Sequence, residues 1–323
     1  MTPRTPVSTP FTAASTAAEV LADIDLTGVR AIVTGGSSGI GTETARALAS
    51  AGAEVTLAVR NTAAGDAVAE SIARSTGGIR PRVVRLDLAD RAGVTRFVDA
   101  WGGPLHLLIN NAGVVTADLE RTREGWELQF ATNHLGHFAL ATGLHDALAR
   151  GAADRDGARI VSVSSTAHMR AGIDFDDLHF ERREYDPQLA YAQSKTANSL
   201  FAVEATRLWA SDGVIANAVN PGGVATGLQR NFSTRQRESL DAAEAAGIFT
   251  YKTVEQGAAT SIVAAVAPEF ADSGGHYLDD AREAYTVPDD ADLAQHPHGV
   301  KEWALDPGAA ERLWTVSTDL LQA

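Results

Sequence analysis

The sequence predicts an α/β fold built on one doubly wound parallel sheet with helices on both faces. Short, nearly continuous apolar runs, typical of strands buried on both faces, alternate with longer stretches of helical periodicity. Parallel strands need crossover connections, and right-handed crossovers produce a doubly wound sheet. A glycine-rich turn joins the first strand to the helix that follows it. Because no repeat or linker interrupts this pattern, we expect a single domain.

The predicted elements follow in chain order. Residues 1–25 form an N-terminal arm, loose to about Phe11, with a short helix after the capping-box pair Thr16 and Glu19. The predicted strands are Val29–Thr34, Glu54–Val59, Arg82–Leu86, Leu105–Ile109, Arg159–Val163 and Val214–Val219. The predicted helices are Gly41–Ala51, Ala63–Arg74, Arg91–Ala100, a long one from Arg121 to Arg150 with a break near Thr132, and one from Tyr191 through Ala205.

Two segments are longer than this scheme requires. The alternation occupies residues 26–280, and residues 281–323 form a C-terminal extension that ends in a helix at Pro307–Leu321. Thr166–Leu189, between the fifth strand and the helix at Tyr191, is charged and aromatic. Loops of this length are commonly functional or partly disordered.

Composition excludes several classes of protein. Lys and Arg number 27 against 41 Asp and Glu, and the formal net charge of −14 repels phosphate backbones, which argues against a nucleic-acid partner. The absence of cysteine removes disulfides, thiolate zinc sites and a cysteine nucleophile. The nine histidines show no metal-ligand spacing completed by an acid, so we expect no metal. No apolar run suits a secretory signal or a membrane span, and we expect a cytoplasmic location.

The glycine-rich turn is suited to a diphosphate. Thr34 is followed by Gly35, with Gly39 and Gly41 at the spacing G-x-x-x-G-x-G, directly before a helix. Glycine lets the backbone approach the anion, and the helix N-terminus offers unpaired N–H groups. Ser37 and Ser38 add hydroxyl donors. This turn predicts a Rossmann-type dinucleotide site.

Arg60 indicates which dinucleotide binds. It follows the second strand, where an NAD enzyme would be expected to carry Asp or Glu for the ribose 2′-hydroxyl. A guanidinium pairs with a 2′-phosphate instead. We therefore expect NADP(H) to be preferred over NAD(H); the alternative is a solvated arginine at a strand end.

Tyr191 and Lys195 stand one helical turn apart and share a helix face. A free phenol is a poor acid or base near neutral pH, and a nearby cation lowers its pKa. The pair is therefore a candidate general acid/base, although a lone pair at this spacing is more often an ordinary surface feature.

Several ordered motifs strengthen the interpretation. The chain carries TGGSSGIG, NNAG, ATNHLGHF, VSVSS, YAQSK and NPGGVATG at strand ends or on the helices that follow, where open parallel sheets bind ligands. Over about residues 26–278 the sequence resembles the short-chain dehydrogenase/reductase family. This resemblance implies hydride transfer between a nicotinamide cofactor and a carbonyl or alcohol carbon.

The resemblance also implies residue roles. Tyr191 would be the proton donor or acceptor, Lys195 would lower its pKa and hold the ribose, Ser165 would hydrogen-bond the substrate oxygen, and Asn133 would hold a relay water. Asp87 and Leu88 would contact the adenine end, Asn111 to Gly113 the ribose, and Val224 and Thr226 the nicotinamide amide. The implied cofactor-binding residues are Gly35, Ser37, Ser38, Gly39, Ile40, Gly41, Arg60, Asp87, Leu88, Asn111, Ala112, Gly113, Tyr191, Lys195, Pro221, Gly222, Val224 and Thr226.

Some of these assignments have alternatives. Ser164 and Ser165 point to opposite faces of an extended strand, so only one can face the substrate, and the resemblance favours Ser165. Asp87 could instead cap a turn. His168 and Met169 could reach the substrate or merely support a loop.

The segment before Tyr191 departs from many family members by an insertion and is similar to the retinol dehydrogenase-like branch. That similarity implies a hydrophobic aldehyde, ketone or alcohol, covered by the insertion and by residues 227–249. Many relatives pair through the helices that carry Asn133 and Tyr191, which implies a homodimer or tetramer, whereas an obstructing insertion would leave a monomer. A non-catalytic NADP(H) sensor and a dehydratase or epimerase on the same scaffold are the alternative functions.

Overall fold

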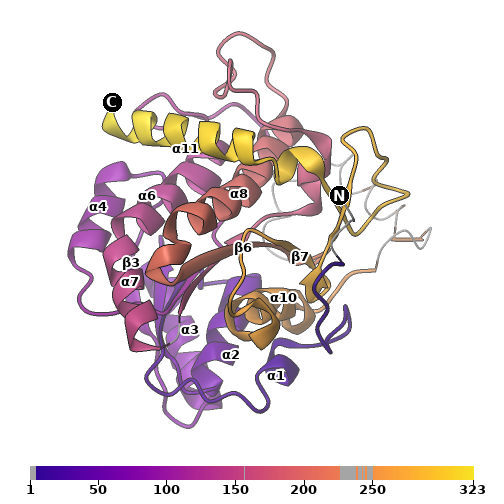
Figure 1. Cartoon of the computed structure of the whole chain (residues 1–323). Helices are drawn as coiled ribbons and strands as arrows, with labels where there is room; N and C mark the ends of the chain where they lie inside the picture. The colour runs from indigo at the N-terminus through magenta and orange to yellow at the C-terminus, as the bar shows by residue number, and fades with distance from the viewer. Residues whose placement is uncertain (1–4, 156, 226–237, 239–241, 243, 246–249) are drawn as a thin grey trace.

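The sheet is the frame of the molecule. The computed structural model describes residues 5–155, 157–225, 238, 242, 244, 245 and 250–323 (Figure 1). Within these residues eight strands follow the order β3-β2-β1-β4-β5-β6-β7-β8. Neighbours from β3 to β7 are parallel, and β8 is antiparallel to β7. The predicted doubly wound α/β fold in a single domain is confirmed. The strands are β1 Arg30–Thr34, β2 Glu54–Val59, β3 Arg82–Arg85, β4 Leu107–Asn110, β5 Ala158–Val163, β6 Val214–Asn220, β7 Tyr277–Asp279 and β8 Arg282–Glu283.

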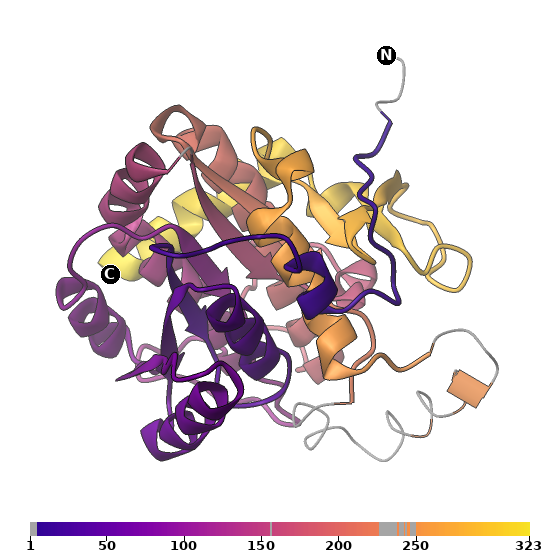
Figure 2. The same cartoon turned by 90° about the horizontal axis from the view of Figure 1, so that it is seen from below.

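Helices cover both faces of this sheet (Figures 1 and 2). One layer holds α2, α3 and α10, with the short α1 packed beside α10; the other holds α4, α6, α7 and α8. The helices are α1 Ala17–Val20, α2 Gly39–Ser50, α3 Thr62–Ser75, α4 Arg91–Asp99, α5 Leu128–Phe130, α6 Gly136–Gly143, α7 His145–Asp154, α8 Pro187–Trp209, α10 Val254–Val266 and α11 Pro307–Gln322.

Strand alternation supplies the two halves of the core. Val33 and Ile109 face the α2/α10 layer, whereas their neighbours Ile32 and Leu108 face the α4/α8 layer, and all four side chains are inaccessible to solvent. Burial on both faces explains why these strands are continuous apolar runs rather than alternating ones.

The C-terminal extension adds a helix outside the α8 layer. After β8 the chain forms a parallel pair of strands, β9 (Tyr285–Val287) and β10 (Gly299–Lys301), and then crosses to α11, which lies on α8 (Figure 1). Trp314 of α11 packs edge-on against Phe138 of α6, with ring centroids 4.8 Å apart, and stacks on Phe201 of α8 at 6.0 Å. The extension is therefore part of the folded body.

Two expectations need correction. The helix predicted from Arg121 begins only at Leu128, because the backbones of Arg121 and Glu127 form an antiparallel bridge across a turn. The Glu127 carboxylate then caps the helix by accepting the N–H of Phe130. The helix then continues through a π-helical turn, Ala131–Leu135, into α6 and α7. The N-terminal arm is also not loose to Phe11, since the Val7 N–H donates to the Glu283 carboxylate and the Val7 carbonyl accepts the N–H of Glu283 in β8.

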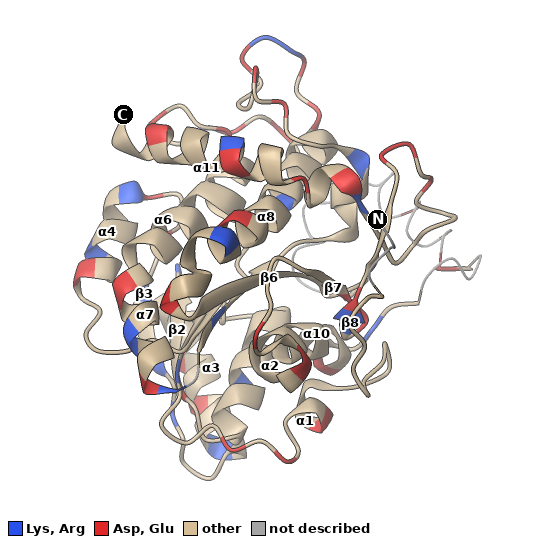
Figure 3. Cartoon of the chain, viewed as in Figure 1, with Lys and Arg blue, Asp and Glu red and all other residues tan. Residues whose placement is uncertain are grey.

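Charged side chains are spread over the outer helices and loops rather than gathered in one patch (Figure 3). Among the described residues, no helix combines the length and apolar character needed to cross a bilayer.

Candidate active site

The predicted motifs meet at one edge of the sheet. Strands β1, β4, β5 and β6 follow one another in the sheet and are parallel. Their carboxyl ends, at Thr34, Asn110, Val163 and Asn220, therefore lie along the same edge. Each of these residues is buried, and each is followed by one of the sequence motifs. This edge is the position at which a doubly wound sheet binds its ligand.

The glycine turn has the geometry of an anion cradle. Gly35 has a φ of +67°, and a Cβ on it would lie 2.9 Å from Ala112 Cα. A Cβ on Gly41 would lie 2.4 Å from Asn111 Nδ2. Ser38 is the N-cap of α2, yet its hydroxyl makes no capping hydrogen bond. The first N–H groups of a helix of 12 residues thus lie at a turn whose N-cap hydroxyl does not cap the helix, which fits a diphosphate.

Arg60 lies just beyond the end of β2, directly before the N-cap of α3. Its side chain is exposed, and within the described part of the chain no acidic group forms an ion pair with it. The guanidinium is therefore available to an anionic ligand.

The residues after β3 combine a turn with a buried side chain. The Asp87 carboxylate accepts the N–H of Ala89 at 3.1 Å, so the capping role considered for it is real. This bond uses one carboxylate oxygen. Leu88 is buried against α6, where a Cβ on Gly136 would lie 2.3 Å from the Leu88 carbonyl oxygen.

Asn111 and Ala112 are fastened to the end of β1. The Thr34 hydroxyl accepts both of their backbone N–H groups, at 2.9 and 3.0 Å, and Asn111 Nδ2 donates to the Thr34 carbonyl at 2.8 Å. Gly113 follows, and a Cβ on it would lie 3.4 Å from Asn133 Oδ1 and 3.6 Å from Lys195 Nζ. The loop after β4 thus brings the glycine turn, Asn133 and Lys195 together.

Tyr191 and Ser165 face one another at the same edge. The Ser165 hydroxyl hydrogen-bonds the Tyr191 phenol and lowers its pKa, whereas Ser164 is buried and donates to the Lys195 carbonyl at 2.8 Å. The strand therefore presents Ser165, and not Ser164, to Tyr191. Two hydroxyls side by side can donate to one carbonyl oxygen.

The electrostatics of the tyrosine differ from the expectation. Lys195 Nζ lies 5.6 Å from the Tyr191 ring centroid and donates to the Val163 carbonyl at 2.9 Å. Burial raises the pKa of Tyr191 to about 12, against the opposing Ser165 hydrogen bond, and burial lowers the pKa of Lys195 to about 8. In the protein alone, desolvation of the phenolate thus outweighs the Ser165 hydrogen bond, and the lowering of the Tyr191 pKa by Lys195 stays a prediction.

Asn133 lies in the π-helical turn and is fully buried. Its side-chain amide accepts the Val114 N–H at 2.8 Å and donates to the Val114 carbonyl at 3.1 Å. The same amide also donates to Ser194 Oγ at 3.0 Å. The side chain therefore connects the loop after β4 to α8 next to Lys195.

The loop after β6 packs against the glycine turn. Val224 is buried, and a Cβ on Gly257 of α10 would meet both Val224 and Ile40. Pro221 is buried and Gly222 is half-buried beside Lys252. Thr226 lies outside the described residues, as do most of residues 227–249, which were expected to cover the substrate.

A family profile decides the relationship of the chain to known proteins. The profile described as short chain dehydrogenase matches residues 30–237. The chain belongs to the short-chain dehydrogenase/reductase family. A protein named "Probable oxidoreductase" from Streptomyces antibioticus is 48% identical over 305 residues, which cover 93% of this chain and 100% of that protein. Human polyprenol dehydrogenase is 40% identical over 264 residues, covering 80% of this chain and 78% of that enzyme.

Solved structures agree. An uncharacterized protein from Mycobacterium paratuberculosis has a TM-score of 0.71 and 31% identity, covering 94% of this short-chain dehydrogenase and 97% of that chain. An active-site complex of Pseudomonas aeruginosa RhlG with NADP has a TM-score of 0.64 and 26% identity, covering 79% and 95% of the two chains.

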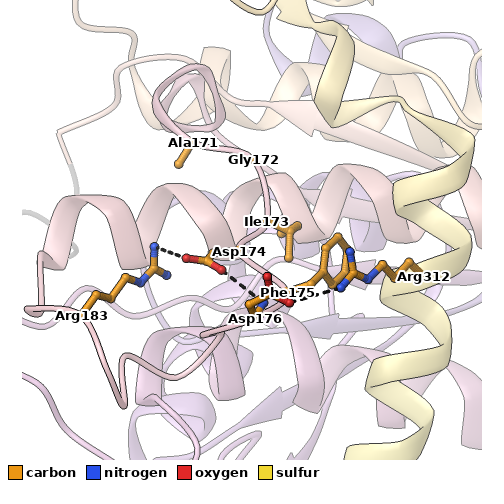
Figure 4. A pocket seen from close by; sticks show the side chains of 8 residues that line it. All are labelled: Ala171, Gly172, Ile173, Asp174, Phe175, Asp176, Arg183 and Arg312. Atoms are coloured by element: carbon orange, nitrogen blue, oxygen red, sulfur yellow. Dashed lines mark hydrogen bonds and ion pairs between the residues drawn. The ribbon is translucent and has the colours of Figure 1, made fainter.

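The insertion of this short-chain dehydrogenase also forms a pocket of its own. A shallow hollow of about 450 Å³ lies between Ala171–Asp176 and α11 (Figure 4). Both arginines of the hollow already interact with neighbouring side chains. Arg183 forms an ion pair with Asp174 at 3.0 Å, and the Arg312 guanidinium lies over the Phe175 ring at 4.4 Å (Figure 4). Neither Ser165 nor Tyr191 lines this hollow.

Of the two roles considered for His168, the structure shows support of the turn after Ser165, and sequence reasoning missed its partners Tyr277 and Trp303. His168 is buried and supports this turn, because its Nδ1 lies 2.8 Å from the Ser165 carbonyl and 3.0 Å from the Tyr277 hydroxyl. Trp303 of the C-terminal extension donates its indole N–H to the His168 carbonyl at 3.1 Å. Met169 is also buried. The extension thus braces the segment that carries Ser165, which no local sequence signal indicates.

A second cluster anchors the C-terminal loop. His298 Nδ1 lies 2.8 Å from Asp279 and 3.3 Å from Asp280, and Lys252 pairs with Asp280. Asp279, Asp280 and His298 have the arrangement of metal ligands, and the ammonium of Lys252 pairs with the Asp280 carboxylate.

Proposed function

We propose that this protein is an NADP(H)-dependent oxidoreductase that interconverts a ketone or aldehyde and an alcohol, with Tyr191 as proton donor in reduction and acceptor in oxidation. The observation that carries the proposal is the grouping of Ser165, Tyr191 and Lys195 at the strand ends, next to the glycine cradle. Neither a sensor nor a structural protein needs two facing hydroxyls above a buried lysine.

When bound, the dinucleotide would supply the hydride to a carbonyl carbon or accept it from an alcohol carbon. Ser165 and Tyr191 would hydrogen-bond the substrate oxygen, and the Tyr191 proton would pass to that oxygen as the alcohol forms. Lys195, whose ammonium is buried beneath the ring, would stabilise the phenolate left behind and draw a replacement proton from solvent. Asn133 would hold the loop and helix in register through Val114 and Ser194.

NADP(H) is proposed over NAD(H) because Arg60 is exposed at the end of β2 with no acidic partner among the described residues. The 2′-phosphate is the group that such a guanidinium binds and that a carboxylate would repel. The NADP complex of RhlG supports this choice. The diphosphate would lie on Gly35–Gly41, and the nicotinamide ribose beside Asn111–Gly113 and Lys195.

A hydrophobic substrate is proposed, in keeping with the retinol dehydrogenase-like pattern of the insertion. Polyprenol dehydrogenase, named for a long isoprenoid alcohol, aligns over four-fifths of this chain and supports the same class. We therefore favour long-chain or isoprenoid aldehydes, ketones and alcohols.

The test is NADPH oxidation by the purified protein with a panel of carbonyl compounds, in parallel with Tyr191→Phe. We expect the variant to bind NADPH as the wild type does but to lose turnover by about 100-fold or more, because it retains the ring and lacks the proton. Turnover equal to wild type would reject Tyr191 as the acid/base. NADPH binding without oxidation across the panel would favour a sensor, and product formation without net cofactor use would favour a dehydratase or epimerase.

A further inference from the structure

A buried chain of hydrogen bonds runs from the glycine turn to the π-helical turn through a histidine. His137, on α6, is 3% exposed. Its Nε2 lies 2.8 Å from the Thr34 hydroxyl at the end of β1, and its Nδ1 lies 2.9 Å from the carbonyl oxygen of Asn133. Thr34 and His137 are 103 residues apart in sequence, so only the fold brings them together.

The direction of every proton in this chain is determined. A carbonyl only accepts, so Nδ1 must carry the imidazole proton and Nε2 must accept. The Thr34 hydroxyl then donates to Nε2 at 2.8 Å, which is closer than its second acceptor, the Ile109 carbonyl at 3.3 Å, and its lone pairs accept the N–H groups of Asn111 and Ala112. A protonated imidazole would give the Thr34 oxygen three donors for two lone pairs, in a site where burial lowers the pKa of His137 to about 4. The chain therefore holds one neutral tautomer.

This chain is connected to the site at both ends. At one end, Thr34 fixes the backbone of Asn111 and Ala112, beside the proposed ribose position. At the other, the π-helical turn carries Asn133, whose side chain holds Val114 and Ser194. His137 hydrogen-bonds neither Tyr191 nor Lys195, although the charge of Lys195 contributes to lowering its pKa.

We propose that His137 is a positioning residue, which locks the π-helical turn of Asn133 to the glycine turn through Thr34 and so sets the nicotinamide-ribose position and the Asn133–Lys195 geometry. The inference rests on the proposed function, because that position matters only if a dinucleotide binds. It predicts that loss of the imidazole acts on cofactor binding and turnover together, and not only on folding.

His134 provides a matched control. It lies one turn earlier, is as deeply buried, and also has a depressed pKa, yet its Nε2 bonds Ser317 of α11 at 2.8 Å, on the side of the C-terminal helix. His134→Phe and His137→Phe therefore each remove one buried imidazole from the same stretch of helix, and only the second change breaks the hydrogen bonds that join this stretch to the glycine turn.

The experiment measures the NADPH dissociation constant by nucleotide fluorescence, kcat with an active carbonyl compound, and the melting temperature. We expect His137→Phe to weaken NADPH binding and lower kcat, each by about 10-fold or more, because misplacement of about 1 Å has large effects on reacting groups. We expect His134→Phe to lower the melting temperature while both site parameters stay within about twofold of wild type.

Two further variants keep the test decisive if His137→Phe does not fold. His137→Gln offers one donor and one acceptor and should restore most of the NADPH affinity, and Thr34→Val breaks the other end of the chain and should repeat the site defect. Two outcomes would overturn the inference. One is that the effect of Thr34→Val adds fully to that of His137→Phe or His137→Gln. The other is that NADPH affinity and kcat are unchanged in every variant of Thr34 and His137. A wild-type protein that neither binds nor oxidises NADPH would instead reject the proposed function.

Discussion

At the scale of single residues, burial acts on Tyr191 and Lys195 in opposite directions. Desolvation penalises both charged forms, so it raises the pKa of the phenol to about 12 and lowers that of the ammonium to about 8. The two pKa values therefore move apart, and in the protein alone burial favours the neutral phenol and the neutral amine over the charged pair.

The lowered pKa of Lys195 predicts how stability depends on pH. Above about pH 8 the folded protein releases this proton, whereas the unfolded chain keeps it to about pH 10.4. Because the unfolded state then binds more protons, the lysine's contribution to the free energy of unfolding rises with pH between those values. We expect the wild type to gain stability over this window relative to Lys195→Met. Urea titrations of both proteins at pH 7 to 10 measure it; parallel pH curves would show that the lysine is not desolvated.

Arg60 predicts cofactor preference. Arg60→Asp replaces an exposed cation with a carboxylate that repels a 2′-phosphate and can accept the ribose hydroxyl, so NADPH binding should weaken by about 10-fold or more while NADH binding improves or stays unchanged. Fluorescence titration with both dinucleotides measures the effect. Equal weakening of the two would reject contact with the phosphate.

Single residues were predictable where chemistry follows from local spacing. Strand alternation predicted that only one of Ser164 and Ser165 faces the substrate, and the family resemblance favoured Ser165, which the structure places beside Tyr191. The partners of Asn133 and the Thr34–His137 contact were not, because they join segments far apart in sequence. A buried histidine has no local signal that tells a positioning residue from an ordinary core residue.

At the scale of elements, apolar periodicity gave good bounds for strands and weaker ones for helices. Six strands were predicted close to their observed positions, but β7 was missed because it has only three residues. The helix expected at Arg121 starts seven residues late, because the buried Glu127 ends the preceding turn and caps α5. The π-helical turn replaces the expected break at Thr132 with a continuous, widened helix, and no residue pattern distinguishes the two.

The C-terminal helix α11 bears on the oligomeric state. It covers α8 and part of α6, the helices expected to mediate pairing, and buries Leu313 and Ser317 against them. We therefore propose a monomer and expect light scattering after gel filtration to give about 33.9 kDa. A stable dimer would show that pairing uses another face. Removal of residues 307–323 should expose the aromatic surface around Phe138 and Phe201 and promote self-association.

At the scale of the whole molecule, parallel topology makes the site. Four motifs, separated by up to 190 residues in sequence, meet because parallel strands end at one edge. This much followed from the sequence. The support of the turn after Ser165 did not, since His168 is held there by Tyr277 of β7 and by Trp303 of the C-terminal extension, which folds back onto the sheet edge.

The central claim is hydride transfer to a carbonyl carbon with Tyr191 as the proton donor, and an isotope experiment tests it most directly. The wild type and Tyr191→Phe are incubated with NADPH deuterated at the transferable C4 position and with geranial, retinal or decanal. Mass spectrometry should find one deuterium on the carbinol carbon of the alcohol made by the wild type, and almost no alcohol from the variant. Alcohol without deuterium, equal product from the variant, or no alcohol from any carbonyl compound despite NADPH binding would contradict the claim.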